Sequence, residues 1–190
     1  MKLPLTGDPK ADQLLEDEPL ALLIGMLLDQ QFPMERAFHS AYDLKQRLGR
    51  LDAAEIAAMD GENLAAVFRG PPALHRYPGS MAGRTQDLCR LLVERYDGRP
   101  ENLWADAPDG ATLLRRLGEL PGFGAQKSKI FIALLGKQYG VTPAGWREAA
   151  GDYGLEGSRR SVADITGPET LLEVRAFKQE QKQAAKAAKQ

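Results

Sequence analysis

Residues 120–124 read LPGFG, and they are the part of the sequence best suited to holding a phosphate group. Gly122 and Gly124 permit backbone angles that other residues avoid, and their missing Cβ atoms let a ligand approach the N–H groups closely. The helical pattern that follows would add the unpaired N–H donors and the partial positive charge of a helix N-terminus. Lys127 and Lys129 can attract an anion further. This turn is predicted to hold one phosphate oxygen, although a tight turn without a ligand also explains the two glycines.

Helices must flank this turn and position it. An amphipathic helix is predicted over residues 111–119 and a second helix over 125–137. No stretch alternates as a strand would, and helical spacing or a first-turn proline predicts further helices at 20–31, 34–48, 52–58, 62–68, 80–96 and 143–150, with others from Pro9 and Pro168. We expect an all-α fold of about 8–11 helices in two small lobes. Its parts would be an N-terminal helical extension (1–17), a central domain (18–150) and a C-terminal segment with a terminal helix (151–190).

The predicted helix at 20–31 is apolar all round until it ends in Asp29, Gln30 and Gln31. This pattern is typical of a helix buried in a core, with a polar tip that reaches the surface. The tip is therefore a second candidate site, and an ordinary polar helix terminus is the alternative interpretation.

The net charge is only −1, but the charges are unevenly distributed. Five cationic side chains face one carboxylate, Glu119, between residues 110 and 140: Arg115, Arg116, Lys127, Lys129 and Lys137. The first thirty residues hold six carboxylates and two lysines. We therefore expect a basic surface near the middle of the chain and an acidic N-terminus that faces away from any phosphate.

Metal centres and membrane spans are not expected from this composition. The single cysteine, Cys89, and two separated histidines cannot build a typical zinc site or iron–sulfur cluster, which also argues against an iron–sulfur assembly factor. The longest apolar run, residues 20–28, is far shorter than the roughly 20 residues that cross a bilayer. Without a signal segment, the protein is expected in the cytoplasm, with the nucleoid in a bacterium, as a monomer that binds no membrane.

Three segments together resemble one known family. LPGFGAQKSKIFIALLG resembles the LPGxGxxTAxxxxxxxxG signature of the helix-hairpin-helix DNA glycosylase superfamily, which includes endonuclease III. LLIGMLLDQQFPMERA is similar to the family's early helix, which ends in a serine- and glutamine-bearing turn, and YPGSMAGRTQDLCRLLVERYDG is similar to the helix before the hairpin. The resemblance covers about residues 18–146. It implies base-excision repair, with DNA held mainly by its phosphate backbone and without strong sequence preference.

The chain departs from this family at the catalytic positions. Where the family has its aspartate, this sequence has Ala144 or, with a small shift, Thr142. Gln126 stands where the bifunctional members have their Schiff-base lysine, and Lys127 points about 100° away on a helix. The four-cysteine cluster loop is absent, so no resident cofactor is expected, although a monovalent cation could sit at the hairpin. Asp29 and Asp152 are the carboxylates proposed as substitutes for the aspartate.

The resemblance also assigns residues to DNA contact. Gln31, beside Gln30, matches the glutamine that fills the space left by an extruded nucleotide, a plug that offsets the cost of unstacking. The other expected DNA contacts come from the hairpin, the helix after it and two upstream segments: Gly122, Phe123, Gly124, Gln126, Lys127, Lys129, His75, Tyr77 and Arg84. Two functions follow: a monofunctional DNA glycosylase without lyase activity, or a catalytically silent protein of the same fold that recognises distorted DNA.

Overall fold

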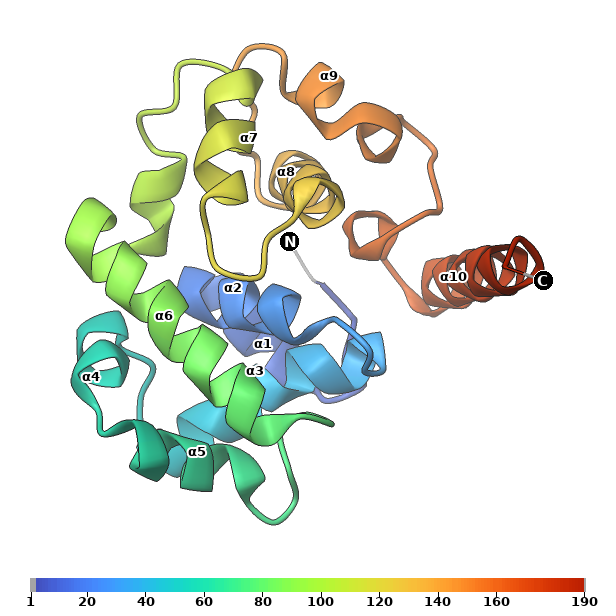
Figure 1. Ribbon diagram of the computed structural model, residues 1–190. Helices are drawn as coiled ribbons and strands as arrows, with labels where there is room; N and C mark the ends of the chain where they lie inside the picture. The colour runs from blue at the N-terminus through green and yellow to red at the C-terminus, as the bar shows by residue number, and fades with distance from the viewer. Residues whose placement is uncertain (1–2, 190) are drawn as a thin grey trace.

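The computed structural model describes residues 3–189; Met1, Lys2 and Gln190, at the ends of the predicted segments 1–17 and 151–190, lie outside them. The described part contains ten α-helices, three short 3-10 helices and no β-strand (Figure 1). The prediction of an all-α fold is confirmed. The α-helices are α1 (Pro9–Asp17), α2 (Pro19–Leu28), α3 (Met34–Leu48), α4 (Ala53–Ala58), α5 (Gly61–Arg69), α6 (Pro78–Tyr96), α7 (Gly110–Gly118), α8 (Ala125–Gln138), α9 (Trp146–Ala150) and α10 (Pro168–Ala187), and the 3-10 helices are η1 (Pro100–Leu103), η2 (Gly151–Gly154) and η3 (Val162–Asp164).

Helix α2 forms the centre of the core. Every residue of its Leu20–Leu28 stretch is buried, as the unbroken apolar run predicts. Helices α1, α3 and α6 pack around it (Figure 1). Gly25 is required at the contact with α3, because a Cβ there would lie 2.4 Å from Cδ1 of Phe38. The polar residues at the end of α2 are therefore carried by a helix that its neighbours fix on several sides.

Two groups of helices extend from this centre. Helices α4 and α5 pack on α6, while α7, α9, η2 and η3 gather around α8. Within α8 the stretch from Phe131 to Leu135 is buried, so this helix is the core of the second group. Residues 119–124 join α7 to α8 as predicted, and the part of this connection at residues 120–124 is called the hairpin turn below.

One predicted helix start is wrong. A helix was expected from Pro143, but α9 begins only at Trp146. The carbonyl of Ala144 accepts a hydrogen bond from the N–H of Gly110 at 2.7 Å, which keeps this segment extended. Gly145 then turns the chain with a φ of +71°. The backbone contact with the start of α7 outweighs the local preference of proline for a first helical turn.

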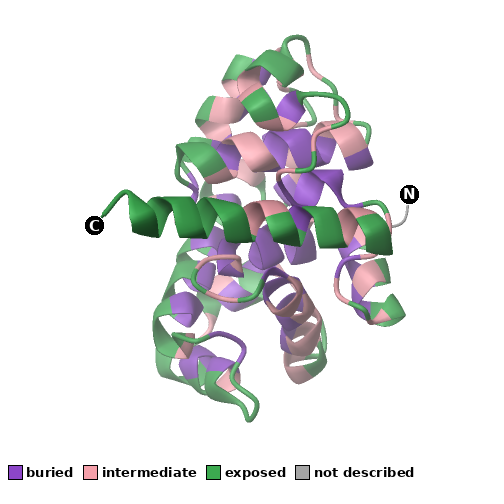
Figure 2. Ribbon diagram, turned by 90° about the vertical axis from the view of Figure 1, so that its right-hand side faces the viewer, coloured by how far each residue is buried: buried purple, intermediate pink, exposed green. Residues whose placement is uncertain are grey.

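Helix α10 lies across one face of the molecule, and most of it is exposed (Figure 2). Val174 is its one buried residue. The predicted terminal helix is present as α10, and its first half contacts the body of the protein. No helix in the described range is long and apolar enough to cross a bilayer.

Candidate functional site

The polar end of α2, residues 29–31, forms an exposed corner that we call the α2 tip. Asp29 ends the helix, and Gln31 follows with a φ of +50°, a left-handed conformation that is uncommon for residues other than glycine. Gln31 is also exposed, whereas Gln30 is half-buried. The backbone is therefore strained at Gln31, the residue predicted to fill the space left by an extruded nucleotide.

His75 holds this strained corner from behind. Its side chain is 2% exposed, with Nε2 3.1 Å from the carbonyl oxygen of Leu28 and 3.0 Å from that of Gln30. Nδ1 accepts a hydrogen bond from the N–H of Tyr77, so the proton lies on Nε2 and the ring is neutral. Burial lowers the pKa of His75, in agreement with this form. His75 thus satisfies carbonyls at the end of α2 and has no surface for DNA.

Lys127 links the last turn of α2 to α8. Its Nζ donates a hydrogen bond to the carbonyl oxygen of Leu27 at 3.2 Å and lies 6.0 Å from the centre of the Phe123 ring. Burial lowers the pKa of Lys127 to about 8, while the charge of Asp29 opposes this shift. The ammonium group therefore faces the end of α2, and it is engaged within the protein.

The hairpin turn packs directly on α2. Gly122 has a φ of +78°, and a Cβ there would lie 2.4 Å from Cδ1 of Leu27. Phe123 is buried and meets the Phe131 ring edge-on, so it anchors the turn and is covered by protein. Gly124 differs from both, because its backbone is extended and a Cβ added to it would meet no atom within 4 Å. Helix α8 begins here without a capping side chain, which leaves its first N–H groups available to a ligand.

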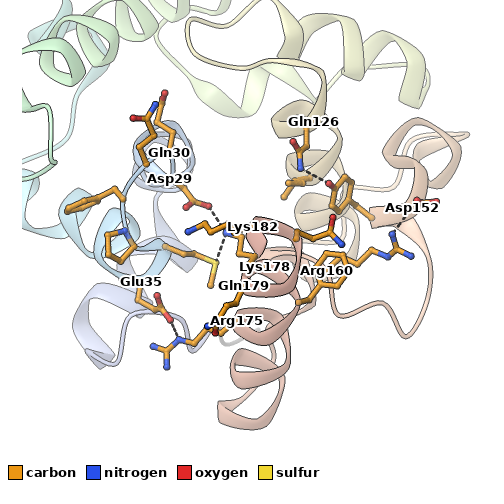
Figure 3. Close-up of a pocket in the computed structure, with 18 residues that line it drawn as sticks. Asp29, Gln30, Glu35, Gln126, Asp152, Arg160, Arg175, Lys178, Gln179 and Lys182 are labelled. Carbon is orange, nitrogen blue, oxygen red and sulfur yellow. Dashed lines mark hydrogen bonds and ion pairs between the residues drawn. The ribbon is translucent and has the colours of Figure 1, made fainter. Parts of the chain in front are cut away.

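A cleft of about 750 Å³ lies beside the α2 tip and the start of α8 (Figure 3). Its walls come from the α2 tip and the start of α3, from α8, from η2 and the segment after it, and from α10. The cleft brings together five predicted residues from three distant parts of the sequence: Asp29, Gln30, Gln31, Gln126 and Asp152. Gln126 donates a hydrogen bond to the hydroxyl of Tyr153 at 2.8 Å.

The two predicted carboxylates differ in their surroundings. The side chain of Asp29 is 13% exposed, and Oδ2 lies 3.3 Å from Nζ of Lys178. The side chain of Asp152 is 72% exposed, and it pairs with Arg160 at 3.3 Å. Charge interactions are stronger where water is excluded, so Asp29 has the larger electrostatic effect on a group in the cleft.

Sequence reasoning missed the cationic wall of the cleft. Arg160, Arg175, Lys178 and Lys182 all line it, and three of them belong to α10. Figure 3 shows the two lysines extending from α10 toward the side of the cleft where Asp29 lies. The start of α3 supplies a further acid in Glu35, which pairs with Arg175. No local pattern predicts these contacts, because the helix that supplies the cations lies at the other end of the chain.

The remaining predicted contacts lie around the α2 tip. Arg84 donates a hydrogen bond from its guanidinium to Oε1 of Gln30 at 3.1 Å, so it supports the tip. Tyr77 is exposed, with the guanidinium of Arg76 5.5 Å from the centre of its ring. Lys129 is half-buried and has no acidic partner in the described part of the chain. Thr142 and Ala144, the positions predicted to correspond to the family's aspartate, do not line the cleft.

Cys89 lies far from this chemistry. Its thiol is fully buried, and burial raises its pKa to about 12, which makes it unreactive. Within residues 3–189, no group of three or more His, Cys, Asp or Glu side chains is arranged to hold a metal ion.

Comparison with protein-family models, with characterised proteins and with solved structures gave no match to this chain.

Proposed function

We propose that the protein binds duplex DNA in base-excision repair, as a divergent monofunctional DNA glycosylase. The observation that carries the proposal is the packing of Gly122 on the end of α2, where a Cβ would lie 2.4 Å from Cδ1 of Leu27 and 3.9 Å from Nε2 of Gln30, so the hairpin turn adjoins the α2 tip. Gly124 and the uncapped start of α8 would bind a phosphate oxygen with backbone N–H groups. The exposed Gln31 would enter the duplex where a nucleotide has been extruded.

The cleft supports the enzymatic part of the proposal. Its volume of about 750 Å³ is in the usual range for small-molecule sites. Asp29 would stabilise the positive charge that develops on the sugar as the base departs, because a carboxylate shielded from water acts strongly at short range. Water would then attack the sugar, since Gln126 offers no amine.

A second candidate is a catalytically silent DNA-binding protein of the same type. It is favoured by the ion pair of Asp29 with Lys178, which offsets the negative charge that the chemistry needs. In that case the protein would recognise distorted DNA without cutting a glycosidic bond.

The test is a panel of labelled duplexes that contain uracil, oxidised, alkylated, mismatched or abasic positions. We expect binding that weakens as salt is added and excision of at least one base. Gly124→Ala should weaken binding, because its methyl group would obstruct the phosphate while touching nothing in the protein. Gly118→Ala is the matched control, since it also adds a methyl group to open space, outside the hairpin turn. Absence of binding at low salt would overturn the proposal, and binding without excision would favour the silent protein.

A further inference from the structure

The structure places most of the cations around the hairpin turn in contacts within the protein. Of the five cations between residues 110 and 140, only Lys129 has no partner in the described part of the chain. The other four are engaged within the protein: Lys127 with the Leu27 carbonyl, Lys137 with Asp164, Arg115 with Glu119 and Arg116 with Asp106. Affinity for DNA depends strongly on cations that neutralise phosphates, so another part of the molecule must supply them.

Helix α10 carries such cations in one row. Arg175, Lys178, Lys182 and Lys186 are all of its basic residues, and we call them the α10 row. At about 100° per residue, the four side chains fall within an arc of about 80°. The helix's three acids, Glu169, Glu173 and Glu180, cluster on the opposite side by the same count. A helix stabilised by its own ion pairs would place acidic and basic side chains on the same face. Helix α10 instead places them on opposite faces.

The α10 row continues the proposed DNA surface. Arg175 pairs with Glu35 and Lys178 pairs with Asp29, so the first half of the row is fixed beside the α2 tip. Lys182 lines the same cleft as Gln126, at the start of α8. Lys182 and Lys186 have no acidic partner within residues 3–189, and both are exposed. The row therefore begins at the cleft with two paired cations, and its two outer lysines, Lys182 and Lys186, extend from there as positive charge without an acidic partner in the described range.

We propose that the α10 row is a second DNA contact, which binds the phosphates of one strand next to the site held by the hairpin turn. The inference rests on the proposed function. From Arg175 to Lys186 the row is about 16 Å long, so it is long enough to reach more than one phosphate of a strand. An anionic membrane is a poorer match, because the residues between the last lysines are glutamine and alanine and offer no large apolar side chains to insert.

The test compares Lys182→Gln/Lys186→Gln with the unmodified protein. Duplex binding is measured by fluorescence anisotropy at several salt concentrations, and the slope of log K against log salt is determined. Loss of two phosphate contacts should reduce the magnitude of this slope by about 1.8. Lys10→Gln/Arg99→Gln is the control for overall charge, because it also removes two exposed positive charges that lie outside the cleft and the hairpin turn: Lys10, which has no acidic partner in the described range, and Arg99, which pairs with Glu101. Circular dichroism checks that α10 remains helical.

The outcomes separate this inference from the function on which it rests. If the unmodified protein does not bind DNA, the proposed function fails. If Gly124→Ala weakens binding but the α10 double variant keeps the full slope, the hairpin site stands and the α10 row is excluded as a DNA contact. A slope reduced equally in the control variant would mean that only overall charge matters, and it would also overturn the inference. Binding to phosphatidylserine vesicles that is lost only in the α10 variant, with an unchanged DNA slope, would assign the row to membranes.

Discussion

Nζ of Lys178 lies 3.3 Å from Oδ2 of Asp29, so the better buried of the two predicted carboxylates is paired with a cation from α10. A carboxylate that stabilises a developing sugar cation must keep its negative charge and face the sugar. The paired lysine opposes that effect. Substitutions of Asp29 and of Lys178 should therefore have opposite effects on the rate of base excision, on any duplex that the unmodified protein cuts.

Asp29→Asn should lower the single-turnover excision rate at least about 100-fold and leave DNA affinity unchanged or higher. Lys178→Met should raise that rate by up to about tenfold at saturating protein, which corresponds to about 1.4 kcal/mol. Asp152→Asn is the comparison, because Asp152 is exposed and should change the rate little. The measurement is gel-resolved base excision under single-turnover conditions. A large loss in Asp152→Asn together with a normal rate in Asp29→Asn would exchange the roles of the two carboxylates.

The two glycines of the hairpin turn should respond differently to alanine. Gly122→Ala introduces a Cβ into the space of Leu27 at a φ of +78°, so we expect a loss of about 1–3 kcal/mol in the free energy of unfolding. Gly124→Ala meets no atom, and its extended backbone suits any residue, so stability should change by less than about 1 kcal/mol. The free energy of unfolding of each variant is measured by denaturant unfolding. Equal stability of the two variants would contradict the packing of the hairpin turn on α2.

The neutral form of His75 should make stability depend on pH. Since burial lowers the pKa of His75, the unfolded chain binds a proton at a higher pH than the folded protein does. The free energy of unfolding should therefore fall as the pH decreases below about 6.5 and level off below the lowered folded pKa.

The measurement uses a His39→Gln background, in which His75 is the one histidine left. Adding His75→Gln should flatten the change in stability across this pH range, while a glutamine amide can still donate to the carbonyls of the α2 tip. If His39→Gln and His39→Gln/His75→Gln have the same dependence of stability on pH, His75 is not held in its neutral form.

The sequence predicted the elements of the site better than their contacts. Local signals were sufficient for the hairpin turn and the α2 tip, because proline, glycine and an unbroken apolar run act within a few residues. The direction of a side chain is not local. Lys127 turns toward a carbonyl 100 positions earlier, and Lys178 reaches an aspartate 149 positions earlier. A sum of charges along the chain therefore overstated the basic surface at the hairpin and overlooked α10.

The last prediction concerns how a base would be removed. Gln126, which lines the cleft, cannot form a Schiff base, and the amine of Lys127 is hydrogen-bonded to Leu27. We therefore expect hydrolysis that leaves an intact abasic strand, and borohydride should trap no covalent complex with an abasic duplex. The experiment is most stringent near pH 8, because burial lowers the pKa of Lys127 to about 8 and makes its amine neutral and nucleophilic more readily than that of an exposed lysine. A trapped complex that disappears in Lys127→Gln would assign lyase chemistry to that lysine. A trapped complex that disappears only in Lys178→Gln would assign the lyase chemistry to Lys178 of α10. Either result would replace the hydrolytic mechanism proposed for this cleft.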